Sequence, residues 1–172
     1  MLMTSTFAAI LGSLALAVNT AAPAWQPDYA TAYAQSSAAR KPLAVFIGHG
    51  NGGACCVVAK GLTAEENKSL ADKFVVLYVD SDSTEGKSLT KSFQITEGLV
   101  ISDVTGGLQA LKHGGGLTHE ELTGYLTKYS DPAREVKTTD MGGTLRTATP
   151  VVTSTSRYMT LGGYSTCPNC RN

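Results

Sequence analysis

Four short runs of apolar residues predict the strands of a buried sheet. Leu43–Ile47 and Val75–Val79 are continuous apolar runs, which is typical of strands that are covered on both faces. Two further runs flank Asp103–Gly107, whose residue types are those of a hairpin connection. These predicted hairpin strands are Leu99–Ser102 and Leu108–Leu111.

Capping residues predict four helices around these strands. Thr63 with Glu66, and Thr118 with Glu121, have the spacing of a capping box, in which each side chain bonds the backbone N–H of the other residue. Lys41–Pro42 ends the first helix, because the residue before a proline is pushed out of the helical region. The helices are expected to begin at Asp28, Thr63, near Glu85 and at Thr118, which gives the order α-β-α-β-α-β-β-α.

Both the order of elements and several local sequences resemble a known family. The residues that carry the likeness are Trp25, Asp28–Ala30, Lys41–Phe46, Phe74–Asp80 and Leu99–Asp103. They resemble exported thioredoxin-like proteins related to the C-terminal domain of the periplasmic thiol-disulfide interchange reductase. A strand, crossover helix and strand, followed by a hairpin and a terminal helix, is the core order of that fold. The resemblance implies an α/β thioredoxin-like domain with a central, mixed, four-stranded sheet flanked by helices.

The first 24 residues have the pattern of an export signal. Phe7–Val18 is uncharged, rich in Ala and Leu, and too short to span a bilayer. Ala22–Ala24 supplies the small-x-small pattern of a signal peptidase site, so we expect Trp25 to be the mature N-terminus. Met1–Thr6 has no Lys or Arg, which keeps an uncleaved anchor as the alternative. The protein is therefore expected in the periplasm or outside the cell, with no membrane span after signal removal.

The mature chain divides by composition into a domain and a tail. Residues 25–132 carry the predicted helices and strands, whereas residues 133–172 are rich in Thr, Ser and Gly without sustained periodicity. Such composition predicts a flexible tail. Pro150–Val152 and Tyr158–Met159 are alternative candidates for an added edge strand.

The balance of charge suggests neither nucleic acid nor an anionic lipid surface as a partner. The chain has 14 basic and 14 acidic residues and a formal net charge of +0. No general attraction to nucleic acid or to anionic lipid follows from this balance.

Cys55 and Cys56 are the first candidate site. The resemblance places the attacking thiol of a thioredoxin near Cys55, with a resolving cysteine three positions further on. Here Cys56 is adjacent instead, and a disulfide between neighbouring residues is strained, because their Cα atoms are about 3.8 Å apart. The family's cis-proline is also missing from the approach to the third strand, Ile95–Gly98. Cys55 and Cys56 are therefore interpreted as structural residues or disulfide partners, as a redox pair, or as metal ligands.

The loop before these cysteines is rich in glycine and contains one histidine. His49, Gly50, Gly52 and Gly53 are its candidate functional residues. His49 could carry a proton or bind a soft metal, although a loop histidine is usually only solvated. The other histidines, His113 and His119, are expected at the surface.

Cys167 and Cys170 form a CxxC in the tail. A redox CxxC needs a strand before it and a helix after it, and two thiols are only half of a tetrahedral zinc site. The four cysteines allow three pairings. Local Cys167–Cys170 pairing is entropically easiest, while a bond from the tail to Cys55 or Cys56 is sterically attractive.

Two functions follow from this pattern. The first is a non-catalytic binding or structural module of the cell envelope, which needs no metal or cofactor and whose partners are envelope proteins or peptides. The alternative is a thiol-disulfide oxidoreductase that uses Cys55 with Cys56 or with the tail pair Cys167 and Cys170.

Overall fold

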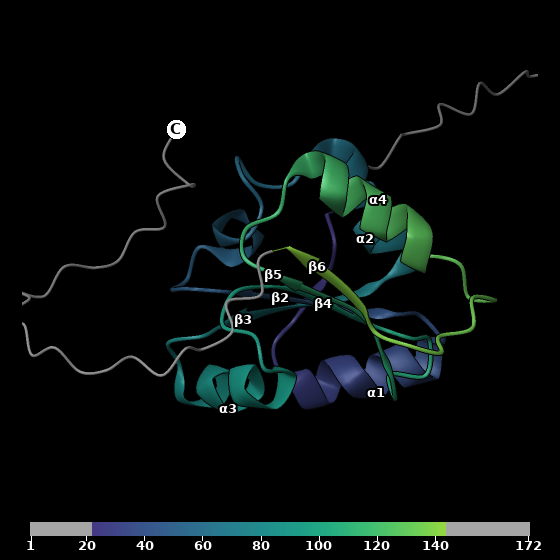
Figure 1. The fold of residues 1–172 in the computed structure, drawn as a ribbon, viewed down its shortest axis with the longest axis horizontal. Coiled ribbons are helices and arrows are strands. Elements are labelled where there is room, and N and C mark those ends of the chain that lie inside the picture. Colours follow the sequence, from purple (N-terminus) through teal and green to yellow (C-terminus); the bar gives the residue numbers. More distant parts are fainter. Residues whose placement is uncertain (1–21, 144–172) are drawn as a thin grey trace, which may run out of the picture.

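A six-stranded mixed sheet lies between two layers of helices in the computed structural model, which describes residues 22–143 (Figure 1). The strands are β1 (Trp25–Gln26), β2 (Leu43–Gly48), β3 (Val75–Asp80), β4 (Gly98–Ser102), β5 (Gln109–Gly114) and β6 (Asp140–Gly143). The helices are α1 (Tyr29–Ala39), the single-turn 3₁₀ helix η1 (Gly53–Cys56), α2 (Ala64–Lys73), α3 (Thr84–Phe93) and α4 (His119–Tyr129).

The strand order is β1-β3-β2-β4-β5-β6. Strands β1, β3 and β2 are parallel, β4 is antiparallel to both β2 and β5, and β6 is parallel to β5. The predicted α/β class and the four central strands are confirmed. The sheet was predicted with four strands and has six. The edge strands β1 and β6 were missed because they are short and have no apolar alternation that would reveal them.

Three of the four α-helices begin at the predicted capping residues, and α3, which was expected to begin near Glu85, begins at Thr84 with Ser83 as its cap. The Asp28 carboxylate accepts a hydrogen bond of 2.8 Å from the Thr31 N–H. Both expected capping boxes form, at Thr63 for α2 and at Thr118 for α4. Each box satisfies backbone N–H groups that have no partner inside the helix, so these helix starts are fixed locally.

Apolar side chains form one core on each face of the sheet. Helices α2 and α4 cover one face, and α1 and α3 cover the other (Figure 1). Phe46, Leu70 and Leu122 belong to the first core, whereas Ile47 and Phe93 belong to the second. Neighbouring residues of β2 therefore point into different cores, which explains why the whole strand is apolar.

Strand β6 lies within the segment that was predicted to be a flexible tail. Its first residue, Asp140, accepts hydrogen bonds from Lys128 Nζ, at 2.7 Å, and from the Tyr129 hydroxyl. Just before it, the Thr139 hydroxyl donates to the Gln109 carbonyl oxygen at 2.8 Å. These contacts come from α4 and β5, so tertiary structure rather than an apolar pattern holds β6 in place.

His113 of β5 is buried beneath β6, not at the surface as predicted. Its exposed fraction is 1%, and its Nδ1 lies 3.1 Å from the Tyr125 hydroxyl oxygen. A side chain at Gly142 would meet that hydroxyl and stand 2.9 Å from His113 Nδ1. Glycine therefore allows β6 to cover the imidazole closely.

Several expectations concern residues that the structure does not describe. They are the apolar stretch Phe7–Val18, the candidate strands Pro150–Val152 and Tyr158–Met159, and the cysteines Cys167 and Cys170. Within residues 22–143, no helix is long and apolar enough to cross a membrane.

Candidate functional site

An open groove of about 340 Å³ lies beside η1. Its walls combine two aromatic side chains, one aliphatic side chain, an amide, and the backbone of the glycine-rich loop. The lining residues are Trp25, Gly52, Gly53, Ala54, Cys55, Leu62, Asn67 and Tyr78. The groove thus joins residues from β1, η1, α2 and β3 with the Gly52 end of the loop.

The glycine-rich loop is held from β3. The Tyr78 hydroxyl donates to the Gly50 carbonyl oxygen at 2.7 Å, and the Gly50 N–H donates to Asp80 Oδ1 at 2.8 Å. Gly53 has a φ of 64°, which a residue with a side chain rarely adopts. The loop therefore has a defined path from β2 to η1, and the rim of the groove is set by strand side chains.

Cys55 and Cys56 point to different environments. Cys55 is half-buried, lines the groove, and places its sulfur against the Gly52 carbonyl oxygen. Cys56 is only 7% exposed and packs closely on Gly48. A Cβ added to Gly48 would stand 3.0 Å from the Cβ of Cys56. The two cysteines are not bonded to each other. Of the two, Cys55 is the one that a molecule in the groove can reach.

The position of the expected resolving cysteine is occupied by Val58, three residues after Cys55. Val58 is fully buried in the core beneath α2 and α4. Moreover, η1 ends at Cys56, and the next helix begins only at Ala64. Cys55 therefore lies in a single 3₁₀ turn and not at the start of a long α-helix.

The approach to β4 has no cis peptide bond, since none occurs in the part of the chain that is described. Gly98, where β4 begins, has a φ of 136°, and a Cβ there would collide with the His113 carbonyl oxygen. The place where the resemblance implies a substrate clamp is thus occupied by close contact between β4 and β5.

His49 lies outside the groove lining, on the exposed side of the loop. Its Nδ1 is 3.0 Å from the Ser81 hydroxyl oxygen and 3.3 Å from Asp82 Oδ1. A serine nucleophile activated by histidine needs contacts on both ring nitrogens, one to the serine and one to the orienting carboxylate. Here both contacts use the same nitrogen, so this arrangement is not a relay.

Of the candidate residues from the sequence, Cys55, Gly52 and Gly53 line the groove. Gly50 helps to fix the loop instead, through its bonds to Tyr78 and Asp80. The groove walls Trp25, Leu62, Asn67 and Tyr78 were not predicted as site residues. The sequence indicates them only weakly. Tyr78 is the one residue in the apolar run Val75–Val79 that has a hydroxyl group, and Trp25 is the chain's only tryptophan.

Metal binding finds no support among residues 22–143, which contain no group of three or more His, Cys, Asp or Glu side chains arranged to hold an ion. No protein-family model, curated protein or solved structure matches the chain.

Proposed function

We propose that this chain is an exported thioredoxin-like domain that binds proteins or peptides of the cell envelope without catalysing disulfide exchange. Its order of elements supports the fold: α2 crosses over between the parallel strands β2 and β3, β4 and β5 form a hairpin, and α4 follows. This is the core order of a thioredoxin fold. Strands β1 and β6 are additions at the two edges.

The observation that carries the non-catalytic function is Val58. Thioredoxin chemistry releases the mixed disulfide by attack of a second thiol one helical turn from the first. At that position this domain has a fully buried apolar side chain, and the neighbouring Cys56 is turned toward the core. Among residues 22–143, therefore, no second thiol is placed where it could release a mixed disulfide from Cys55.

The groove suits a polypeptide ligand. Trp25 and Tyr78 contribute aromatic rings to its walls, and Asn67 contributes a side-chain amide. Binding sites for polypeptides combine aromatic anchors with a few polar groups of this kind. The occupant that we propose is an extended segment of another envelope protein.

A photoreactive side chain placed in the groove tests this binding. The exported protein would carry benzoylphenylalanine in place of Asn67, in a Cys55→Ser background so that no disulfide complicates the result. We expect adducts with other envelope polypeptides after irradiation. The matched control places the same side chain at Met141, which is 58% exposed on the opposite edge of the sheet. Adducts that form equally from Met141, or not at all from position 67, would contradict the proposal.

One observation favours the alternative, a thiol-disulfide oxidoreductase: Cys55 opens into the groove. Insulin reduction separates the two functions. The binding module should reduce insulin no faster than the uncatalysed background, and Cys56→Ser should change nothing. Turnover at a thioredoxin-like rate that Cys55→Ser abolishes would establish the enzyme instead.

Export is tested independently. If the signal is cleaved after Ala24, N-terminal sequencing of the exported protein will begin at Trp25. A sequence that begins at Met1 would show the uncleaved anchor.

A further inference from the structure

We infer that a cavity between α1, α3 and the β4–β5 hairpin binds a small, neutral carbonyl compound whose hydrocarbon part is no larger than a benzene ring. This cavity lies against the second core, on the opposite face of the sheet from the groove, and the two share no lining residue. The inference therefore concerns a separate site and does not depend on the proposed binding function.

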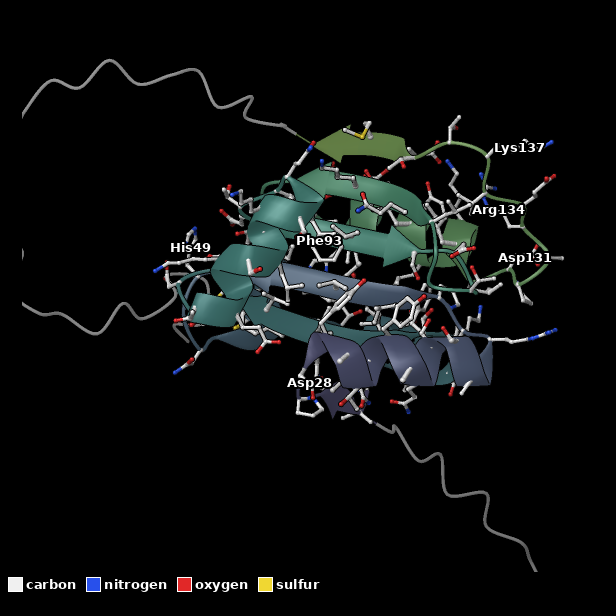
Figure 2. All side chains as sticks on the ribbon, turned by 90° about the horizontal axis from the view of Figure 1, so that it is seen from below. Asp28, His49, Phe93, Asp131, Arg134 and Lys137 are labelled. Carbon is white, nitrogen blue, oxygen red and sulfur yellow. The ribbon has the colours of Figure 1, made fainter. Side chains whose placement is uncertain are left out.

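The floor of the cavity is apolar. Leu43 and Val45 of β2, Val100 of β4 and Phe93 of α3 line it, and all four belong to the second core. Figure 2 looks onto this face of the sheet and shows Phe93 at the end of α3, over the central strands. The cavity has a volume of about 110 Å³. Because an apolar cavity of roughly 150 Å³ binds benzene, this space suits one small ring or a short branched chain.

The residues of α1 explain why this space is left. Helix α1 has 11 residues, and the two that it buries, Ala32 and Ser36, have small side chains. The helix therefore adds little volume to the second core. Protein cores contain few voids larger than a water molecule, so a cavity of this size is an exception within the fold.

The rim of the cavity is fixed by the hairpin between β4 and β5. Within the hairpin, the Thr105 hydroxyl donates to the Asp103 carboxylate at 2.6 Å. The Ser37 hydroxyl of α1 donates to the Thr105 carbonyl oxygen at 3.0 Å. Gly106 lies so close to the Tyr33 ring that a Cβ there would stand 2.8 Å from it. The hairpin is thus tied to α1, and contacts within the domain define the entrance.

Two side-chain polar groups that line the cavity have no hydrogen-bond partner in the described part of the chain. They are the Tyr29 hydroxyl and the Gln109 amide. Ser102 also lines the cavity, but its hydroxyl accepts from the Leu43 N–H and donates to the Asp103 carbonyl oxygen. Tyr29 and Gln109 can both donate, and a carbonyl oxygen has two lone pairs to accept them. A carbonyl group is therefore the ligand group that satisfies both side chains.

Charge and protonation favour a neutral ligand. None of the residues that line the cavity is charged, so an ion placed there would lose its hydration without gaining a partner. Burial raises the pKa of Tyr29, and the nearby Tyr33 raises it further. The Tyr29 hydroxyl therefore stays protonated at neutral pH and acts as a donor. Its ring packs against Phe93, with 5.6 Å between the ring centroids, which positions the hydroxyl.

Cyclopentanone and cyclopentane are matched probes of the cavity, because they share a ring and differ in the carbonyl group. Each would be titrated into the full-length, isotopically labelled wild-type protein and followed by NMR. Cyclopentanone should shift the amide signals of Leu43, Val45 and Val100 in a saturable manner and give NOEs to their methyl groups. Shifts that do not saturate, or NOEs only to Trp25 and Leu62 in the groove, would overturn the inference.

Tyr29→Phe separates recognition of the carbonyl group from filling of the cavity. The variant keeps the ring against Phe93 but removes one hydrogen bond, so it should lower the affinity for cyclopentanone about two- to tenfold. The affinity for cyclopentane should not fall. Tyr33→Phe, at the exposed neighbouring tyrosine, is the control and should change neither affinity. Equal losses for the two probes in Tyr29→Phe would overturn the carbonyl assignment.

Gln109→Met tests the second donor. It removes the amide and leaves the backbone, whose carbonyl oxygen accepts from the Thr139 hydroxyl, unchanged. Cyclopentanone should again bind more weakly, and unchanged affinity in both Tyr29→Phe and Gln109→Met would overturn the inference. Cross-linking from position 67 reports on the groove alone, because Asn67 does not line the cavity. The two sets of measurements therefore distinguish failure of this inference from failure of the proposed function.

Discussion

Tyr129 and Asp140 show how two side chains can add a strand to a sheet. The Tyr129 hydroxyl donates to the Asp140 carboxylate, which Lys128 also binds. Burial of the ring, together with the hydrogen bond to Asp140, raises the pKa of Tyr129. The hydrogen bonds from Lys128 and Tyr129 lower the pKa of Asp140. Both shifts favour the pair in which the phenol is neutral and the carboxylate is ionised.

Removing the Tyr129 hydroxyl should loosen β6. Tyr129→Phe leaves the ring in the core but removes one hydrogen bond to a charged acceptor, which costs about 1.5 to 3 kcal/mol when buried and less at this partly exposed site. We expect a lower melting temperature and faster amide exchange in β6. Tyr33→Phe, at an exposed tyrosine of α1, is the control. Equal losses in the two variants would show that the Asp140 contact does not stabilise β6.

The same pair gives a pH dependence with a defined sign. Because the folded pKa of Asp140 is lowered, its contribution is present above the ordinary value of 3.8 and is lost as the pH falls through the folded pKa. Because the folded pKa of Tyr129 is raised, its contribution is present below 10.0 and is lost at higher pH. Urea unfolding should therefore show the largest difference between wild type and Asp140→Asn from about pH 5 to 9. A difference that grows below pH 4 would contradict this assignment.

At the scale of elements, the contact between β6 and β5 depends on glycine. Gly142 lies against the Tyr125 hydroxyl and His113 Nδ1, so a methyl group there must displace the strand or break the bond between these side chains. We expect Gly142→Ala to destabilise the protein by about 1 to 3 kcal/mol and to expose His113 to solvent, as measured by urea unfolding and by NMR titration of the imidazole.

Gly124 provides the opposite case. It lies inside α4, and nothing stands within 4 Å of a Cβ placed there. Gly124→Ala should stabilise the protein by about 0.5 to 1 kcal/mol, because alanine loses less backbone entropy in a helix. If both glycine variants shift stability in the same direction, the steric explanation for Gly142 fails.

These elements also show what the sequence could reveal. Helices α2 and α4 were predictable because Thr63 and Thr118 fix their starts through residues three positions away, and β2 because all its residues are apolar. Strand β6 was not predictable, since its sequence, Asp-Met-Gly-Gly, has no alternation and its contacts come from α4 and β5. Cys55 could be chosen as a candidate because it is a cysteine. Trp25 and Tyr78 become groove residues only when β1 and β3 pair, which their residue types do not reveal.

For the whole molecule, the domain should extend to Gly143. A chain that ends at Gly143, compared with full length under reducing conditions, should melt within a few degrees, because every described contact is kept. A chain that ends at Pro132 loses β6 and uncovers His113. It should melt roughly 5 to 10 °C lower, as expected for a loss of about 2 kcal/mol. Equal melting of the two shortened chains would mean that β6 adds nothing to stability.

The short edge strands also bear on how copies of this protein meet one another. Strand β1 has two residues, and β6 has four, of which the last two are glycines. An edge strand aggregates when it offers a long, flat, apolar row of unpaired N–H and C=O groups to a second chain. Within residues 22–143, neither β1 nor β6 offers such a row. Edge-to-edge pairing between two copies is therefore disfavoured at the edges formed by β1 and β6 in the described part of the chain.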